Sequence, residues 1–562
     1  MTTSSDQLPP GGVDVVARHG RLVFRTVLIS SLTLSSRLIG FAREALAAAM
    51  FGDRSSINDA FVTAWRVPNL FRSLLGEGAM STALQTAITK ADAERGEEAG
   101  RALFLAIARV LTLILVVLCA SVMLLVFYMP DRMPITGWAW LGSDPGPVRE
   151  LTIRMMPFVI LVCLSALASG ALNVRGHFLS PSLAPVLMNL FWIGGLVAVG
   201  IYWGWTRPAG TSDADEYGRQ FGMVRWLASF ALVTGVVLLL VQVPALVSNG
   251  FLGRRSVLAG VDALRVPTRQ VLDVLKASAP LALGAAVYQV NVMVDGFMAL
   301  GLLGKGGASV LYYATRVQQF PMSLVSIAAT SAVFPALTAL GHRRDLPNVR
   351  VLHDRTQLAI AFVAIPATVG LLFFTEPIVS VIFHHGQFTQ GGVDRASDAL
   401  RFLTLAILPA GAAGLVARTY YALGDFRTPV RISVLALFAN VLLNLLFVRG
   451  FGMEVGGMTL ATATTAWANL MVLSPGLRTR LGLPAAQSDF FPRLLRILAA
   501  ALGSSFVAWV LYRALHAGER HSAVLLFAAI GVSVGVYAVL CHLLRIPEWS
   551  HVLDRARGRG RT

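Results

Sequence analysis

The sequence predicts an all-α polytopic membrane protein with about 14 transmembrane helices, in two parallel six-helix lobes around a central cavity plus two C-terminal helices. The first observation is composition, since 55% of the 562 residues are hydrophobic and only 14% are charged. Soluble globular proteins carry roughly 25% charged residues. The second is the length of apolar runs such as 103–129 and 521–544, which suit helices crossing ~30 Å of hydrocarbon and are too long for barrel strands. The third is an internal repeat.

Turn residues and charges divide the apolar runs into successive helices. In chain order, we expect these helices at 22–51, 57–86, 102–129, 151–174, 180–203, 223–248, 274–303, 308–340, 357–384, 397–423, 428–449, 455–476, 491–514 and 521–545. An even number of spans returns the chain to the side of the membrane on which it started. Both termini are therefore expected on one side.

The helices are expected to form an N-lobe at 22–248, a C-lobe at 274–476 and an appended pair at 491–545. Residues 1–21 are polar and are expected to form a mobile cytoplasmic leader. They do not resemble a cleavable signal peptide, because the apolar run that follows carries arginines and is too long. The tail at 546–562 is basic, and basic segments stay on the cytoplasmic side.

Two pairs of similar segments support the two-lobe arrangement. "AWRVPNLFRSLL" begins at Ala64, and "ATRVQQFPMSLV" begins 250 residues later, at Ala314. "VRGHFLSP" (174–181) matches "ALGDFRTP" (422–429), which lies 248 residues later. Six helices per copy give both copies the same orientation in the membrane. Parallel repeats of this kind are typical of transporters, which alternate access to a cavity between the lobes.

The net charge of +17 does not indicate a nucleic-acid partner. Arg and Lys crowd into the connectors 253–276 and 343–355 and into the tail at 555–561, while the connectors 204–222 and 385–396 are less basic or partly acidic. This is the positive-inside pattern of a membrane protein, and a basic rim also attracts anionic membrane lipids. The three cysteines lie in apolar runs without ligand spacing, which argues against a disulfide framework or a zinc site.

Charged residues occur where hydrocarbon is expected. In "SSRLIGFARE" (35–44), Arg37 follows Arg25 by 12 residues, or ~18 Å along a helix, which is too deep for its side chain to reach the interface by snorkelling. A charge at the bilayer centre costs ~2.5–3.5 kcal/mol on insertion scales. The further charges in these helices are Arg43, Glu44, Asp59, Arg66, Arg72, Glu77 and Arg316.

Two interpretations of these charges remain open. In the first, they form internal salt bridges, and Asp59 and Arg66, seven residues apart, share a helix face. In the second, the arginines face a cavity and bind an anion. Arginines outnumber acids in this set, and Arg binds phosphate in a bidentate manner. The second interpretation therefore predicts a phosphorylated, anionic substrate.

"SSRLIGFARE", "NDAFVTAWRVPNLFRSLLGEGAMSTAL" (58–84) and "YYATRVQQFP" (312–321) resemble signature segments of the MurJ (MviN) family of lipid II flippases, in the multidrug/oligosaccharidyl-lipid/polysaccharide exporter superfamily. The resemblance covers nearly the whole chain and is most specific in its first 90 residues. It implies a protein of the bacterial cytoplasmic membrane that moves lipid II, an undecaprenyl-pyrophosphate-linked peptidoglycan precursor, from the cytoplasmic to the outer leaflet by alternating access.

The resemblance also implies residue roles. Asp59 matches the family's essential acid and would be a gate or charge partner, with Glu77 at the matching "EGA" position. Arg72 would contact substrate or the gate. The residues matching the pyrophosphate-binding set are Arg37, Arg43 and Arg316. The sequence departs from the family at Thr315, where the family often has Asp before the helix arginine, and at Thr86, which replaces a proline.

Some family members resemble sodium-coupled carriers, which implies an oxygen cage in the second lobe. Hard cations prefer oxygen ligands. The alternative is interhelical hydrogen bonding, with Asp295 protonated by desolvation. The positions that match the cage are Asp295, Asn440, Asn444, Met458 through its carbonyl, and Thr462.

No phosphate-binding P-loop occurs in the sequence, so we expect no tightly bound cofactor, and an ion gradient or the membrane potential as the driving force. The alternatives are another superfamily exporter of a lipid-linked oligosaccharide, or a drug/cation antiporter, whose pocket should be acidic or apolar. A membrane enzyme would need a catalytic carboxylate or nucleophile cluster, and none is evident, so we expect a transporter. The expected partners are lipid II, membrane lipids and cell-wall synthesis proteins.

Overall fold

The computed structural model describes residues 12–76, 79–129, 146–252, 266, 268–330, 333–482, 490–515 and 522–556. Within these ranges every regular element is helical. In the same part of the chain, nine helices are long and apolar enough to cross a membrane. The expected all-α membrane fold is confirmed. Among the described residues, each expected range contains one helix or a series of two or three consecutive helices.

The first half of the chain forms α1 (Gly12–Phe51), α2 (Ser56–Phe71), the π-helix η1 (Arg72–Gly76), α3 (Ala79–Arg95), α4 (Glu97–Tyr128), α5 (Gly146–Met155), α6 (Phe158–Val174), α7 (Leu179–Trp203), α8 (Asp213–Leu240) and α9 (Val243–Ser248). The second half forms α11 (Thr268–Leu302), α12 (Gly307–Thr330), α13 (Val333–His342), α14 (Leu346–Phe383), α15 (Gln390–Thr404), α16 (Ile407–Ala422), α17 (Arg427–Leu445), the π-helix η2 (Leu446–Gly450) and α18 (Val455–Arg480). They are followed by α19 (Phe490–Leu515), α20 (Ala523–Leu543) and α21 (Pro547–Ala556).

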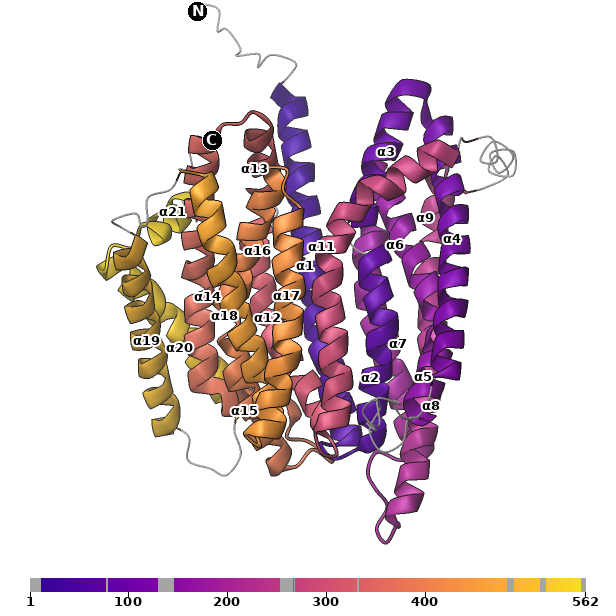
Figure 1. The fold of residues 1–562 in the computed structure, drawn as a ribbon, viewed down its shortest axis with the longest axis vertical. Coiled ribbons are helices and arrows are strands. Elements are labelled where there is room, and N and C mark those ends of the chain that lie inside the picture. The colour runs from indigo at the N-terminus through magenta and orange to yellow at the C-terminus, as the bar shows by residue number, and fades with distance from the viewer. Residues whose placement is uncertain are drawn as a thin grey trace, which may run out of the picture.

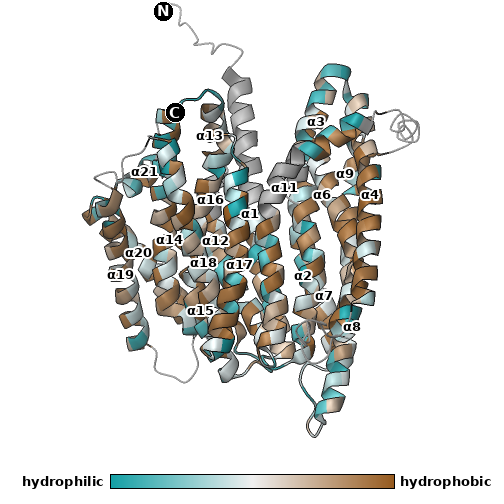
Figure 2. Cartoon of the chain, in the orientation of Figure 1, coloured by the Kyte–Doolittle hydropathy of each residue, from teal (hydrophilic) through white to brown (hydrophobic). Residues whose placement is uncertain are grey.

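The helices form two bundles that stand side by side (Figure 1). Helices α2 to α8 make one bundle, α12 to α18 make the other, and α19 and α20 lie at the outer edge of the second. Helix α1 packs on α7 of the first bundle, whereas α11 packs on α2 and α3 of the first and on α17 of the second. The outward faces of α4 and α19 are strongly apolar (Figure 2), as is required of surfaces that meet acyl chains.

The two bundles repeat the same breaks in the helices. The chain turns at Pro157 between α5 and α6, and again at Ala406 between α15 and α16. Helices α6 and α16 each end in a turn with a left-handed glycine, Gly176 (φ +72°) and Gly424 (φ +82°). Glycine reaches this conformation without the steric penalty of a Cβ. The "G-x-F-x-x-P" segments matched in sequence are therefore the same helix-terminating turn in both lobes.

Several helices begin well before their expected starts. Helices α1, α8 and α14 begin at Gly12, Asp213 and Leu346, against expected starts at 22, 223 and 357. The early turns of α8 and α14 are polar but capped: the side chain of Ser212 accepts from the Asp215 N–H (3.1 Å), and Asp345 accepts from the Asn348 N–H (3.3 Å). Boundaries taken from apolar runs miss such turns, because caps stabilise a helix that extends into water.

Parts of the expected leader and of the expected basic tail are helical. Residues 12–21 belong to α1 rather than to a leader, and residues 547–556 of the basic tail form α21. Residues 1–11 and 557–562 lie outside the described residues. The beginning of α1 and helix α21 lie at the same end of the molecule (Figure 1), which is called the terminal end below.

Candidate functional site

A cavity of about 680 Å³ lies between the two bundles. Helices α1, α2 and α7 line it from one side, and α11 and α12 line it from the other. Among the described residues that line it, Glu44 is the one carboxylate. The arginines that line it are Arg37, Arg43, Arg66, Arg72 and Arg316. The cavity is therefore strongly cationic, as the excess of arginine in the sequence predicted.

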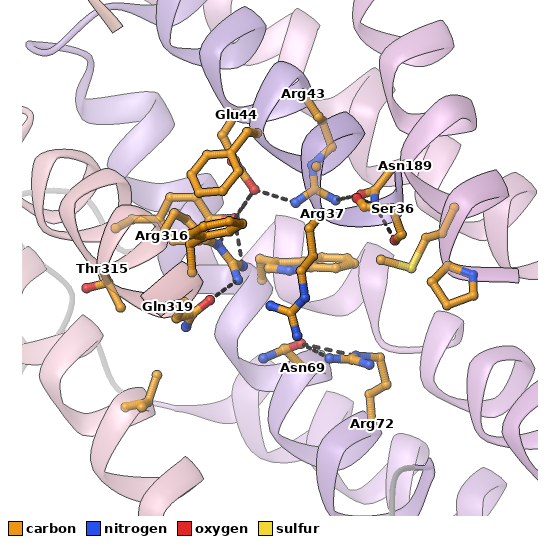
Figure 3. Close-up of a pocket in the computed structure, with 18 of the residues that line it drawn as sticks. Ser36, Arg37, Arg43, Glu44, Asn69, Arg72, Asn189, Thr315, Arg316 and Gln319 are labelled. Carbon is orange, nitrogen blue, oxygen red and sulfur yellow. Dashed lines mark hydrogen bonds and ion pairs between the residues drawn. The ribbon is translucent and has the colours of Figure 1, made fainter. Parts of the chain in front are cut away.

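Glu44 joins two of these arginines (Figure 3). Its carboxylate accepts a hydrogen bond from Arg43 and another from the Tyr312 hydroxyl at 3.0 Å. The Arg316 Nε lies 3.6 Å from the same oxygen. Glu44 is buried, so a charge there must be compensated by its neighbours. One carboxylate thus holds two guanidinium groups, and the cluster keeps a net positive charge.

Neutral side chains orient the same two arginines. Arg316 donates to the Tyr312 hydroxyl (2.9 Å) and to Gln319 Oε1 (2.8 Å). Arg43 donates to Asn189 Oδ1 at 3.0 Å, and the Asn189 amide donates in turn to the Ser36 carbonyl at 2.9 Å. Sequence reasoning missed these partners. They are neutral residues from α7 and α12, and nothing in their local sequence marks them.

Arg72 and Arg37 lie on the other side of the cavity (Figure 3). Arg72, in η1, donates from Nε and Nη2 to Asn69 Oδ1 at 3.1 and 2.9 Å. Arg37 is half-buried and makes no hydrogen bond or ion pair with another described residue. Its guanidinium is directed into the cavity, toward Asn69. Arg37 therefore presents its donors to a ligand, and Arg72 adds positive charge to the same side of the cavity.

Arg66 reaches across from α2 to α11. Its Nη1 donates to the Val292 carbonyl, and its side chain lies against Gly296, where a Cβ would occupy the same space. The Arg66 Nε is buried and has no hydrogen-bond partner among the described residues. The absence of a side chain at Gly296 is what lets the arginine of α2 contact the backbone of α11.

Asp59 does not line the cavity. Its carboxylate accepts from the Gly306 N–H (2.6 Å) and from the Ser309 N–H and Oγ (2.7 Å each), at the beginning of α12. A carboxylate there satisfies free N–H groups and the positive end of the helix dipole. The proposed salt bridge between Asp59 and Arg66 is wrong, because Asp59 is already fully engaged by α12. Glu77 lies outside the described residues.

Further contacts join the bundles near Asp59. Asn58 Nδ2 donates to Ser309 Oγ and to the Tyr313 hydroxyl, both at 3.0 Å. Asp53 is buried, accepts from the Thr389 N–H at 2.9 Å, and pairs with Arg395 at 2.8 Å. These residues lie at the end of the molecule opposite the terminal end, where α1 finishes at Phe51. This closed end, defined by Asp53, Asn58 and Asp59, separates the cavity from that side.

The expected cation ligands lie partly together. The Asn444 Nδ2 donates to Asp295 Oδ1 at 2.8 Å and to Asn440 Oδ1 at 3.0 Å. Asn444 Oδ1 is buried and has no hydrogen-bond partner in the part of the chain that the structure describes. The Thr462 hydroxyl instead donates to the Met458 carbonyl at 3.0 Å, within α18. Asp295, Asn440 and Asn444 thus form one oxygen-rich cluster, while Thr462 and Met458 are bonded to each other.

Comparison with known proteins points to one family. The family model "Lipid II flippase MurJ" matches residues 47–529. The lipid II flippase MurJ of Burkholderia cenocepacia is 30% identical over 487 residues, covering 85% of this chain and 88% of that protein. A probable lipid II flippase MurJ of Vibrio cholerae is 28% identical over 538 residues, covering 94% and 97%.

Two solved structures share the fold. "Lipid II flippase MurJ, inward closed conformation" gives a TM-score of 0.66 at 20% identity, covering 95% of this chain and all of that one. An inward-facing multidrug resistance transporter of the MATE family, from the MOP superfamily, gives 0.61 at 16% identity, covering 79% and 94%. At such identities, these matches show the arrangement of helices.

Proposed function

The chain belongs to the MurJ family of lipid II flippases, and we propose that it moves lipid II across the membrane with the pyrophosphate held by the cavity arginines. It is a transporter, not an enzyme, as its relatives' names state. The observation that carries the proposed site is the set of five arginines around one carboxylate in a cavity between the bundles. An unpaired charge in such a place is costly, so the surplus of cations requires an anionic ligand.

The cavity arginines differ in how firmly they are held, which suits them to different contacts with a diphosphate. Arg43 and Arg316 are fixed by Glu44, Asn189 and Gln319, so they present donors at set positions. Arg37 is held by no described residue, and its side chain is free to close on a phosphate group. Guanidinium groups bind phosphate in a bidentate, charge-assisted manner. This cationic lining argues against the alternative of a drug/cation antiporter.

The closed end supports alternating access. The cavity is lined by Glu44 toward the closed end and by Pro181 and Ser182, in the first turn of α7, toward the terminal end. The basic connectors and tail of the sequence favour a cytoplasmic location for the terminal end. In this arrangement lipid II enters from the cytoplasmic side, and separation of the contacts at Asp53, Asn58 and Asp59 releases it to the outer leaflet.

A sodium ion is the proposed coupling cation. Asp295 supplies a carboxylate, and the buried Asn444 Oδ1 accepts no hydrogen bond from any described residue. Both features fit a hard cation. Sodium chloride should raise the melting temperature of the protein above its value in potassium chloride, and Asp295→Asn should remove the difference. Equal melting temperatures of the unaltered protein in the two salts would contradict the proposal.

The experiment for the substrate site is complementation of bacteria depleted of their own flippase, scored by leaflet labelling of lipid II. Arg37→Ala should abolish translocation while leaving the melting temperature unchanged, because no described residue depends on this side chain. Arg401→Ala is the matched control, since Arg401 is outside the cavity and pairs with Asp398. If Arg37→Ala labels lipid II as fast as Arg401→Ala, the cavity arginine is not a substrate contact.

A further inference from the structure

A second pocket, of about 550 Å³, lies outside the central cavity on the first bundle. It is formed by α5, α7 and α8, and its lining combines two arginines with two tryptophans, Arg154, Arg225, Trp203 and Trp226. Phe230 and Val233 continue it along α8. None of these residues lines the central cavity, so the transport site does not account for the pocket.

The two arginines share one carboxylate. Arg154 Nε and Arg225 Nε each lie 2.8 Å from the same oxygen, Glu150 Oε1. Two guanidinium groups and one carboxylate together carry one net positive charge. The Nη groups of the two arginines have no hydrogen-bond partner among the described residues. Two guanidinium ends therefore present free donors side by side at a half-exposed site.

The two tryptophans of the pocket, Trp203 and Trp226, lie where α7 packs closely on α8. The Trp203 ring lies on Gly222, where a Cβ would collide with it. Arg219 donates to the Trp203 and Gly204 carbonyls at 3.0 and 3.1 Å, which fixes the end of α7. Trp226 is 57% exposed on the outer surface. Trp at such a place is typical of the membrane interface, where one part of the ring is apolar and another meets water.

The depth of the pocket matches that interface. Arg225 lies 12 residues after the beginning of α8 at Asp213, or ~18 Å along the helix. The part of α8 nearer Asp213 is hydrophilic, and the part beyond is hydrophobic (Figure 2). Trp203 is the last residue of α7. The pocket therefore sits where water gives way to acyl chains, at the same end of the molecule as the closed end (Figure 1).

We propose that this pocket binds the anionic phosphate head group of a bilayer lipid in the leaflet at the closed end. Free guanidinium donors suit phosphate oxygens, and a single net positive charge suits a phosphodiester. The exposed Val233 and the half-buried Phe230 extend away from the arginines along α8 and accommodate an acyl chain. A soluble phosphate ion has no apolar part that would contact Phe230 and Val233. A zwitterionic lipid has no net negative charge to match the net positive charge of the pocket.

The test is native mass spectrometry of the purified full chain with phosphatidylglycerol, phosphatidylcholine or inorganic phosphate added in separate arms. Arg225→Gln should weaken phosphatidylglycerol binding about ten-fold, the usual effect of losing a charge-assisted hydrogen bond. Arg401→Gln is the matched control, because its side chain is 47% exposed against 46% for Arg225 and it also pairs with one carboxylate. Ser229→Phe should block the pocket with no change in charge.

Binding of phosphatidylglycerol that exceeds that of phosphatidylcholine and falls in Arg225→Gln and Ser229→Phe, but not in Arg401→Gln, supports the proposal. If Arg225→Gln and Arg401→Gln lose phosphatidylglycerol binding equally, the lipid is attracted to the charged rim in general, and the proposed site is overturned. Competition by inorganic phosphate as effective as that by lipid would overturn the assignment to a lipid. Melting temperatures of all variants separate lost binding from lost folding.

Discussion

At the scale of single residues, Glu44 decides whether the cavity arginines are ordered. Its carboxylate lies between Arg43 and Arg316. The side chain of Glu44 is 7% exposed, that of Arg43 is 15% exposed and that of Arg316 is 28% exposed. Removing one partner of a buried ion pair costs more than the pair contributes, because the remaining charges lose their compensation. Partial exposure reduces the effect, so we expect Glu44→Gln to destabilise the protein by about 2 kcal/mol.

The measurement is the denaturation midpoint of the purified variant, with Asp398→Asn as the control. Asp398 forms an exposed pair with Arg401, at 2.6 Å, and exposed pairs contribute about 0.5 kcal/mol. Adding Arg43→Gln to Glu44→Gln should recover part of the loss, because the repulsion between the two guanidinium groups is relieved. A Glu44→Gln variant no less stable than Asp398→Asn would show that the cluster is not held by its carboxylate.

The same scale shows what sequence reasoning reached and what it missed. A cavity lined by arginines was one of two interpretations of the sequence, and it followed from the excess of arginine over acidic residues in these helices. The orienting partners of the arginines were not predicted. Asn189, Tyr312 and Gln319 are neutral, and they come from helices whose register is fixed only by packing. Asp59 was considered as a partner of Arg66 on its own helix, whereas the helix end that it binds is formed by a segment 247 residues away.

At the scale of elements, Asp59 ties α2 of one bundle to the first turn of α12 in the other. A carboxylate interacts with the helix dipole and accepts several N–H groups, whereas an amide keeps one acceptor and loses the charge. We expect Asp59→Asn to weaken the closed end by about 1 kcal/mol. Thr63, one turn further along α2 and fully buried, is a suitable reporter position.

A Thr63→Cys variant should react slowly with a membrane-impermeant thiol reagent, and the added Asp59→Asn change should speed the reaction about five-fold, in proportion to the opened population. The natural cysteines Cys119, Cys163 and Cys541 are buried and are expected to stay unlabelled. Asp398→Asn on the Thr63→Cys background is the control. An unchanged labelling rate in Asp59→Asn would mean that this cap does not hold the two bundles together.

Elements were the level at which the sequence was most informative. Hydrocarbon thickness sets the length of each apolar run, so every expected range contains helix in the part of the chain that the structure describes. The breaks at Pro157 and Ala406 and the polar first turns of α8 and α14 were not placed. They depend on caps and on packing between helices, neither of which alters hydropathy.

At the scale of the whole molecule, the two bundles meet at the closed end and diverge around the cavity. If transport requires these bundles to separate there, joining them covalently should stop it. Asn58 and Ser309 face each other across the junction at 3.0 Å. We expect an Asn58→Cys/Ser309→Cys variant, treated with a short bifunctional thiol reagent that reducing agents cleave, to lose lipid II translocation and to regain it on reduction.

Each single-cysteine variant, treated in the same way, controls for chemical modification alone. Substrate binding provides the second readout, because a cavity fixed open to the terminal end should still bind lipid II from that side. Retained binding with lost translocation is the pattern expected of alternating access. If the cross-linked protein still moves lipid II at the rate of the single variants, the closed end is not a gate, and the substrate must leave the cavity by another route.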